Sequence, residues 1–352
     1  MQQLTYFLSE RPTGDANAGS KARGDVETVL QDQGFTPFEH IEERRFPSKL
    51  RKLAYKASPA YLRKLAHIES FHGHRLILQY PFYYDAITLR CLRRLVRQNE
   101  TILVVHDVDA LRSFGRISEA DEIATLRSAV CLIVHNAQMA EALCARGVTT
   151  PMVELGVFDY LLTEPFPAQQ RQLAPSVAFA GNLGKSRFLQ DASFLQLPLD
   201  VHLYGVGFDA ARYPGERIHY HGSFPPDRVP YEMDGSFGIV WDGTSAAGCT
   251  GSFGEYLRYN NPHKLSLCIA SGLPVITWRE AATAAFVERE GIGFTVGSLT
   301  EIPARITALT EADYENYRSN LQRLQQGVCT GSYMRSALAR ALEKVKKNGE
   351  EA

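Results

Sequence analysis

The chain lacks the features of several common protein classes. Its 352 residues include only six cysteines, and these form neither a C-x-x-C pair nor a cysteine–histidine spacing typical of zinc sites. No apolar run approaches the roughly 18 residues that span a bilayer. The first residues, MQQLTYFLSERPTG, lack the basic start and apolar core of a secretory signal. We therefore expect a cytoplasmic protein with neither a disulfide framework nor a structural zinc ion.

An excess of charge of one sign is also lacking over the chain as a whole. The formal net charge is −1, whereas general nucleic-acid binders usually carry a basic excess. The exception is local, because residues 44–65 hold eight lysines and arginines among apolar and aromatic residues. This segment is typical either of a surface that touches the inner membrane face from the cytoplasm or of a solvated helix face or subunit contact.

Short apolar runs alternate with longer segments of helical periodicity. The runs predicted to be strands are residues 4–8, 76–79, 102–105, 131–134, 177–180, 201–204, 237–241 and 274–277. Strands separated by helices form parallel sheets with crossover connections. Proline and glutamine interrupt the pattern over residues 161–176. The sequence therefore predicts two doubly wound α/β domains, residues 1–160 and 177–352, joined by this linker.

The last predicted helix spans residues 333–347 and is amphipathic. Its apolar positions are Ala337, Leu338, Ala341, Leu342 and Val345. Such a helix packs either on its own domain or across onto the first domain, and the spacing alone does not decide between the two.

A glycine-rich segment, residues 241–254, precedes the string YNNPHKLSLCIASGLPVI, residues 259–276. In this string a polar loop leads into a short helix, which Gly272 ends before a strand. A helix start beside a flexible loop offers free amides and a positive dipole end to an anion. Together with His263 and Lys264, this pattern predicts a diphosphate site, although an ordinary loop–helix–strand connection has the same appearance.

Six motifs occur in a consistent order: residues 17–22, 105–112, 134–139, 155–160, 179–185 and 259–276. They resemble the GT-B glycosyltransferases, and among these the bacterial glucosyltransferases that extend O-linked N-acetylglucosamine on serine-rich adhesins, together with related galactofuranosyltransferases. The resemblance covers nearly the full length. It implies two Rossmann-like domains facing a cleft, a UDP-sugar donor, a glycan acceptor on a GlcNAc-terminated glycoprotein or a lipid, and a homo-oligomer. One departure is Leu267, which stands where many GT-B enzymes place a ribose-binding glutamate.

Candidate site residues follow the predicted strands, where ligands of doubly wound sheets bind. Donor binding is predicted for Gly181, Asn182, Lys185, Tyr204, Gly222, Phe224, Tyr259, Asn261, His263 and Lys264. Acceptor or sugar binding is predicted for Asn17 and Gly19. The candidate bases are His106, Asp107 and Asp15, although His106 has the alternative of a hydrogen-bonded buried histidine.

Two cations, Lys185 and Lys264, can neutralise a leaving diphosphate. We expect the chain to lack a D-x-D triplet, the carboxylate pair that bridges a metal ion to a diphosphate, so we predict a reaction without metal or other cofactor. The expected reaction transfers glucose or galactofuranose from a UDP-sugar to a sugar hydroxyl of a growing glycan. The alternatives are a non-catalytic glycosyltransferase-like subunit, which Leu267 keeps open, and a sugar-nucleotide epimerase.

Overall fold

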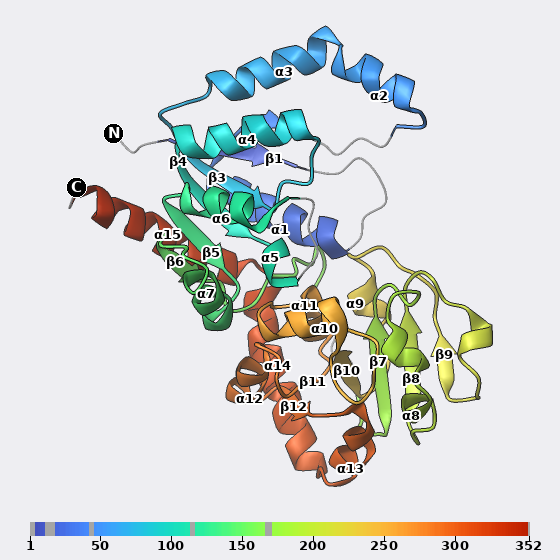
Figure 1. Ribbon diagram of the computed structural model, residues 1–352. Coiled ribbons are helices and arrows are strands. Elements are labelled where there is room, and N and C mark those ends of the chain that lie inside the picture. The colour runs from blue at the N-terminus through green and yellow to red at the C-terminus, as the bar shows by residue number, and fades with distance from the viewer. Residues whose placement is uncertain (1–3, 11–17, 42–45, 113–116, 166–170, 351–352) are drawn as a thin grey trace.

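The structure is a computed structural model that describes residues 4–10, 18–41, 46–112, 117–165 and 171–350. It contains two α/β domains, one above the other in Figure 1. Among the described helices, none is both long and apolar enough to cross a membrane.

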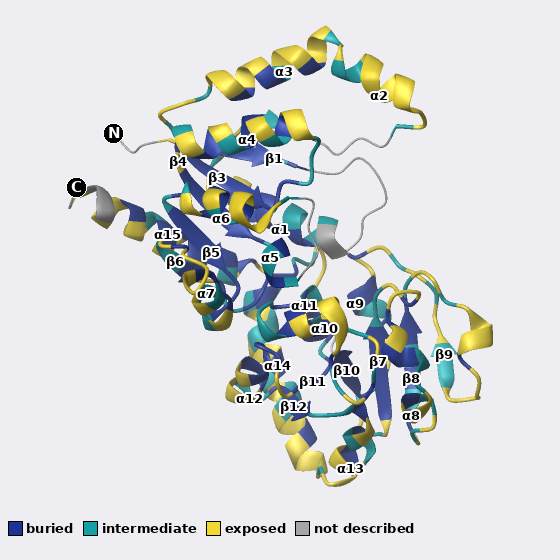
Figure 2. Ribbon diagram, viewed as in Figure 1, coloured by how far each residue is buried: buried dark blue, intermediate teal, exposed yellow. Residues whose placement is uncertain are grey.

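The first domain is built on a six-stranded parallel sheet. Its strands are β1 (Thr5–Ser9), β2 (Thr36–His40), β3 (Arg75–Tyr80), β4 (Glu100–Val105), β5 (Cys131–Val134) and β6 (Met152–Glu154), in the order β2-β1-β3-β4-β5-β6. Its helices are α1 (Ala18–Asp32), α2 (Lys49–Lys56), α3 (Pro59–Ser70), α4 (Ala86–Gln98), α5 (Asp109–Arg112), α6 (Glu119–Arg127) and α7 (Ala137–Cys144). Helices cover both faces, so the central strands are buried and read as continuous apolar runs (Figure 2).

The second domain repeats this architecture with a different strand order. Its strands are β7 (Ser176–Ala180), β8 (Asp200–Tyr204), β9 (Ile218–Tyr220), β10 (Phe237–Val240), β11 (Val275–Trp278) and β12 (Gly293–Val296), in the order β12-β11-β10-β7-β8-β9. Its α-helices are α8 (Ala192–Leu195), α9 (Val229–Glu232), α10 (Gly251–Glu255), α11 (His263–Ala270), α12 (Ala284–Glu290), α13 (Ile302–Thr307), α14 (Glu311–Val328) and α15 (Ser332–Glu350). Short 3-10 helices are η1 (Arg187–Gln190), η2 (Ala210–Arg212), η3 (Tyr256–Arg258) and η4 (Leu299–Glu301). The prediction of two doubly wound domains is confirmed.

The C-terminal helix α15 crosses back onto the first domain, where it packs against β5 and β6. Its apolar side, which includes Ala337, Leu338 and Ala341, is buried in the core cluster of that domain. The start of α15 is fixed by Asp159, whose carboxylate accepts the backbone N–H groups of Tyr333 (3.2 Å) and Met334 (2.7 Å). Of the two possibilities that the amphipathic spacing left open, the structure shows the packing across domains.

Candidate functional site

In both sheets the chain reverses strand order at one point, and there the loops at the carboxyl ends diverge and leave a crevice. In the second domain this point lies between β7 and β10, and in the first domain between β1 and β3. Gly181 follows β7 directly, and Asp242 lies two residues beyond β10. Glu10 follows β1 directly. These loops form the two sides of the candidate site, which we call the second-domain side and the first-domain side.

The second-domain side is built from backbone that approaches too closely for side chains. Gly205, after β8, has φ of +124°, and a Cβ there would lie 1.9 Å from the carbonyl oxygen of Gly181. The backbone N–H of Leu183 donates to Val206 (2.8 Å), which ties the loops after β7 and β8 together. Only glycine tolerates this conformation and this contact. The result is a surface of peptide groups at the carboxyl end of β7.

Lys264 lies beside this backbone. Its Nζ is 2.6 Å from Oδ2 of Asp242 and 5.4 Å from the centre of the Phe179 ring. A Cβ built on Gly181 would lie 3.5 Å from Cε of Lys264, so the Lys264 side chain occupies the space beside this glycine. The structure therefore brings together the cation predicted at the start of α11 and the glycine predicted after β7. The sequence analysis did not single out Asp242, which lies in the glycine-rich segment.

Lys185 and Asn182 lie in the same loop and are exposed. The carbonyl and side-chain oxygens of Asn182 accept the backbone N–H of Lys185 at 3.1 and 3.2 Å, which turns the chain after β7. The Lys185 side chain forms no ion pair with any residue that the structure describes. A free cation next to exposed backbone is suited to an anion that arrives from solution.

His263 is adjacent to Lys264 in sequence but lies in the contact between domains. Its ring stacks on Tyr160 with centroids 5.0 Å apart, and its shielded Nε2 has no partner among the described residues. Burial and the nearby charge of Lys21 lower its pKa to about 4, so the ring is neutral at physiological pH. Its prediction as a donor ligand stays untested, and its surroundings are those of a packed interdomain residue.

Asn261 also joins the domains. Its side-chain amide donates to the carbonyls of His135 and Gly156, both at 2.8 Å, and its oxygen accepts from Asn136 at 2.6 Å. The carbonyl of Tyr259 accepts a second bond from Asn136 (3.0 Å). Both amide protons of Asn261 are thus taken by the first domain, so the side chain is committed to protein partners.

His135 receives the backbone of Asn261 from across the interface. Its Nδ1 accepts the Asn261 N–H at 2.8 Å, which requires the proton on Nε2, and Nε2 is 3.0 Å from the carbonyl oxygen of Val105. Burial lowers the pKa of His135 to about 4. The segment before α11 is therefore held by a neutral, fully bonded histidine of the first domain.

The remaining predicted donor residues support the loops. Tyr204 is buried, its hydroxyl accepts the Asp234 N–H (2.8 Å), and its ring stacks on His221 at 4.7 Å. The carbonyl of Gly222 accepts the N–H of Gly205 at 2.7 Å. Phe224 packs against the core cluster next to α11. These contacts hold the loops after β8 and β9 in place, and the predicted roles of these residues in donor binding stay predictions.

On the first-domain side, His106 follows β4. Its Nε2 is 2.8 Å from Oε1 of Gln79, and its ring stacks on Phe158 with centroids 5.3 Å apart. An amide oxygen only accepts, so Nε2 carries the proton and Nδ1 keeps a lone pair. Burial, with a contribution from the charge of Arg23, holds the pKa of His106 well below its usual value. The ring is therefore neutral, as a general base must be before it acts.

Asp107 and Asp109 have the D-x-D spacing, so the expectation that the chain lacks this triplet is wrong. Both carboxylates pair with Arg112, at 3.1 Å for Asp107 and 2.6 Å for Asp109. Burial raises the pKa of Asp107. The sequence argument for a metal-free reaction thus needs this correction: a D-x-D triplet exists, in the first domain, with its charge compensated by an arginine.

A buried polar cluster near the β1–β3 crevice escaped the sequence analysis. Arg23 pairs with Glu10 and donates to the carbonyl of Pro81 (2.7 Å). Tyr84 donates to Glu10 (2.8 Å), and Glu27 accepts from the backbone N–H of Glu10. These residues meet only because β1, α1 and β3 lie side by side. One feature of the sequence could have indicated this cluster. Arg23 and Glu27, four residues apart, lie on the apolar side of a predicted helix.

Asp15 and Asn17 lie outside the described residues. Gly19 is the second residue of α1. Two residues later, Lys21 contacts Asp25 (2.7 Å), Asp227 of the second domain (2.9 Å) and the carbonyl of Leu161 (2.7 Å). The first turn of α1 is therefore at the junction of the two domains, and the predicted roles of Asn17 and Gly19 in acceptor binding stay predictions.

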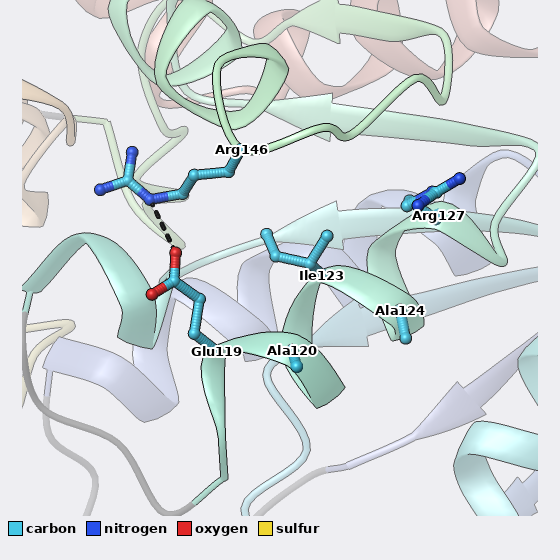
Figure 3. Close-up of a pocket in the computed structure, with 6 residues that line it drawn as sticks. All are labelled: Glu119, Ala120, Ile123, Ala124, Arg127 and Arg146. Atoms are coloured by element: carbon cyan, nitrogen blue, oxygen red, sulfur yellow. Dashed lines mark ion pairs between the residues drawn. The ribbon is translucent and has the colours of Figure 1, made fainter.

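The structure also has hollows away from this crevice. One of these, of about 540 Å³, lies beside α6. Its lining residues include Glu119 and Arg146, which form an ion pair at 3.2 Å (Figure 3). None of its lining residues belongs to the predicted site. A smaller cavity of about 160 Å³ lies beneath α2 and α3 and is lined by Lys52, Tyr55 and Tyr84 among others.

Comparisons with known proteins agree with this architecture. An alpha-glucosyltransferase solved in complex with UDP superposes with a TM-score of 0.58 at 11% identity, covering 98% of this chain and 99% of that chain. At this identity the likeness concerns the fold alone. It supports the assignment of the two facing domains to the GT-B fold.

Sequence comparison reaches further. A beta-1,6-galactofuranosyltransferase of Escherichia coli is 32% identical over 97% of this chain and 99% of its own length. Glucosyltransferase 3 of Streptococcus gordonii is 25% identical over 78% of this chain and 80% of its own length. The models of the N-terminal and C-terminal domains of glucosyltransferase 3-like proteins match residues 5–157 and 177–341. The chain therefore belongs to the glucosyltransferase 3-like family of glycosyltransferases.

Proposed function

We propose that this hexosyltransferase uses a UDP-sugar, with glucose or galactofuranose as the transferred sugar, and a sugar hydroxyl as the acceptor. The names of its relatives support both sugars, since one is a galactofuranosyltransferase and another a glucosyltransferase. The fold neighbour solved with UDP supports the nucleotide. A glycan is the acceptor class that a linkage such as beta-1,6 implies.

The observation that carries the proposal is the position of the Lys264 side chain beside Gly181, at the point between β7 and β10 where the strand order reverses. A sugar–phosphate bond breaks with negative charge developing on the diphosphate, and fixed donors or cations at that place lower the barrier. In our proposal the Lys264 ammonium binds the diphosphate of the donor, and the backbone of the loop after β7 lies against the same diphosphate. The exposed Lys185 side chain binds it from the solvent side. Asp242 holds Lys264 in place before the donor arrives.

On the acceptor side we propose His106 as the base of an inverting reaction, because its neutral ring keeps a lone pair on Nδ1. Asp107 is the weaker candidate, since Arg112 compensates its charge. In a retaining reaction no protein base is required. The predicted roles of Asp15 and Asn17 concern the same side.

We also propose that no metal ion is needed, because Lys264 and Lys185 supply positive charge where the diphosphate would lie. Activity should survive an excess of EDTA. Complete loss in EDTA, restored by Mg²⁺ or Mn²⁺, would contradict this part of the proposal and direct attention to Asp107 and Asp109.

The test of function is release of UDP from UDP-glucose, UDP-galactofuranose, UDP-galactose and UDP-N-acetylglucosamine, each with and without a galactoside or N-acetylglucosaminide acceptor. Acceptor-dependent release from one of the first two donors is the expected result. Conversion of a donor with no acceptor present would indicate an epimerase. UDP binding without turnover on any acceptor would indicate a non-catalytic subunit.

A further inference from the structure

Helix α2 is oriented with its apolar side toward solvent. Leu50 and Leu53 share one side of the helix and are 78% and 66% exposed, and no residue of α2 is buried. The opposite side faces the domain, where the Tyr55 ring lies 5.2 Å from that of Tyr61 and Lys56 pairs with Asp85 at 2.9 Å. A surface helix of a soluble domain normally shows the reverse orientation. The arrangement therefore indicates that solvent is not the only environment of this face.

The apolar surface continues onto the neighbouring helices. Leu62 of α3 is 53% exposed and Ile87 of α4 is 52% exposed. Both lie near the end of α2, because Asp85 contacts Lys56 as well as the Tyr61 hydroxyl. Figure 2 shows α2 and α3 mostly exposed along the outer edge of the first domain. Four of the eight large, well-exposed apolar side chains among the described residues thus gather here, on what we call the α2–α4 face.

This face is also strongly basic. The three helices together hold a single acidic residue, Glu69. Their basic residues are Lys49, Arg51, Lys52, Lys56, Arg63, Lys64, Arg90, Arg93, Arg94 and Arg97. Lys56, Lys64 and Arg93 pair with carboxylates outside these helices. The remaining seven cations, on a chain whose formal net charge is −1, favour an anionic partner.

We propose that the α2–α4 face docks on an anionic lipid surface, with Leu50 and Leu53 entering the headgroup region and the surrounding cations meeting lipid phosphates. Apolar side chains flanked by lysine and arginine on one helix are the usual features of interfacial binding. A second copy of this chain is the poorer occupant, since two such faces would bring like charges together. The segment predicted from sequence, residues 44–65, overlaps this face; Arg44 and Arg45 lie outside the described residues.

The face is linked to the candidate site through direct contacts. Lys56 of α2 pairs with Asp85, and the neighbouring Tyr84 donates to Glu10 at the β1–β3 crevice. Docking would therefore hold the first-domain side of the site close to the membrane surface. The placement of the site near the membrane matters only if the proposed function is correct, whereas the docking of the α2–α4 face does not depend on that function.

The test is co-sedimentation of the full chain with vesicles of phosphatidylcholine alone and with 30% phosphatidylglycerol, at low and high salt. We expect at least tenfold stronger partitioning onto the anionic vesicles, with loss of that preference at high salt. Leu50→Ser with Leu53→Ser, and separately Arg51→Glu with Lys52→Glu, should each reduce partitioning at least tenfold. Transfer to a soluble acceptor should be unchanged in both variants, which separates this result from a failure of the proposed function.

Matched controls exist elsewhere on the chain. Leu4 is 65% exposed, so Leu4→Ser removes comparable apolar surface outside the α2–α4 face. Lys346→Glu with Lys347→Glu reverses two neighbouring exposed charges on α15. Both controls should bind vesicles as the unchanged protein does.

Three outcomes would overturn the proposal. The first is equal binding to neutral and anionic vesicles, or none to either. The second is a loss of vesicle binding in the control variants as large as that in the α2 variants. The third is a dimer in light scattering that dissociates on Leu50→Ser with Leu53→Ser while vesicle binding persists, because a second copy would then cover the face.

Discussion

The two domains share parallel sheets covered by helices, yet they differ where their strand order reverses. At the β7–β10 crevice the second domain offers glycine backbone and the cation of Lys264, held by one carboxylate. At the β1–β3 crevice the first domain offers Glu10, Arg23 and Tyr84, which are bonded to one another. The second-domain side has one lysine paired with one carboxylate and a second lysine, Lys185, that forms no ion pair with any described residue, whereas the charged groups named on the first-domain side are bonded to one another. The difference matches a charged donor on one side and an uncharged hydroxyl on the other.

The largest effect should come from adding a methyl group to the second-domain side. Gly205→Ala places a Cβ 1.9 Å from the Gly181 oxygen at φ +124°, so we expect a loss of about 3 kcal/mol or more in unfolding free energy and no UDP binding. Thermal melting and calorimetry would measure both. Gly24→Ala is the control, because nothing lies within 4 Å of its Cβ position and α1 should gain up to about 1 kcal/mol. Normal UDP binding by Gly205→Ala would show that the loop contact is dispensable.

The next effect concerns the cation. Lys264→Ala should lower kcat/KM about 100-fold, the cost of removing one preorganised group that stabilises developing charge. Lys185→Ala should cost about tenfold or less, because this exposed side chain is screened by water. Steady-state kinetics of UDP release would measure both. Equal effects for the two lysines would contradict the special place given to the position of Lys264 beside Gly181.

A smaller effect of opposite sign is expected at Asp242. Its carboxylate lies 2.6 Å from Nζ of Lys264 and would repel a diphosphate at the same place. Asp242→Asn should therefore tighten UDP binding about three- to tenfold, as measured by calorimetry. Weaker binding would mean that holding Lys264 in position matters more than the repulsion.

A further effect, on stability rather than on ligand binding, concerns the contact between domains. His135 is neutral in the folded protein, with a pKa of about 4 against 6.5 when unfolded. A histidine whose pKa is lowered by folding reduces the free energy of unfolding, and this reduction grows as the pH falls from about 6.5 toward 4. In that range the histidine binds a proton in the unfolded chain but not in the folded one. His135→Gln should destabilise the protein at pH 7.5, and the difference from the unchanged protein should shrink by about 2 kcal/mol at pH 5. Melting curves at both pH values test this, and a constant difference would contradict it.

The sequence predicted the interior strands but missed β2, β6, β9 and β12, and each of these lies at the edge of a sheet. Interior strands such as β4 are buried on both faces and give continuous apolar runs, whereas β2 reads TPFEH and is only partly covered. The edge strands β2, β6 and β9 are partly exposed and carry a weaker apolar pattern, whereas β12 is buried and was missed although it reads GFTV. The prediction of two doubly wound α/β domains did not depend on these four strands.

For the candidate site, the sequence identified residues that lie within recognisable motifs. Gly181 and Lys264 were predicted from separate loops, and the structure places them side by side. The side chains of Asn261 and His263 lie in the contact between domains, and their predicted part in donor binding stays a prediction. The cluster around Arg23 and Glu10 was out of reach, since only the pairing of β1 with β3 brings its members together.

The most direct test of the account is a calorimetric titration of UDP into the unchanged protein, Lys264→Ala and His106→Ala. Because Lys264 belongs to the second-domain side and His106 to the first-domain side, UDP should bind the unchanged protein and His106→Ala alike, and at least tenfold more weakly to Lys264→Ala. Undiminished binding by Lys264→Ala, or an equal loss in His106→Ala, would contradict the division of roles between the two domains.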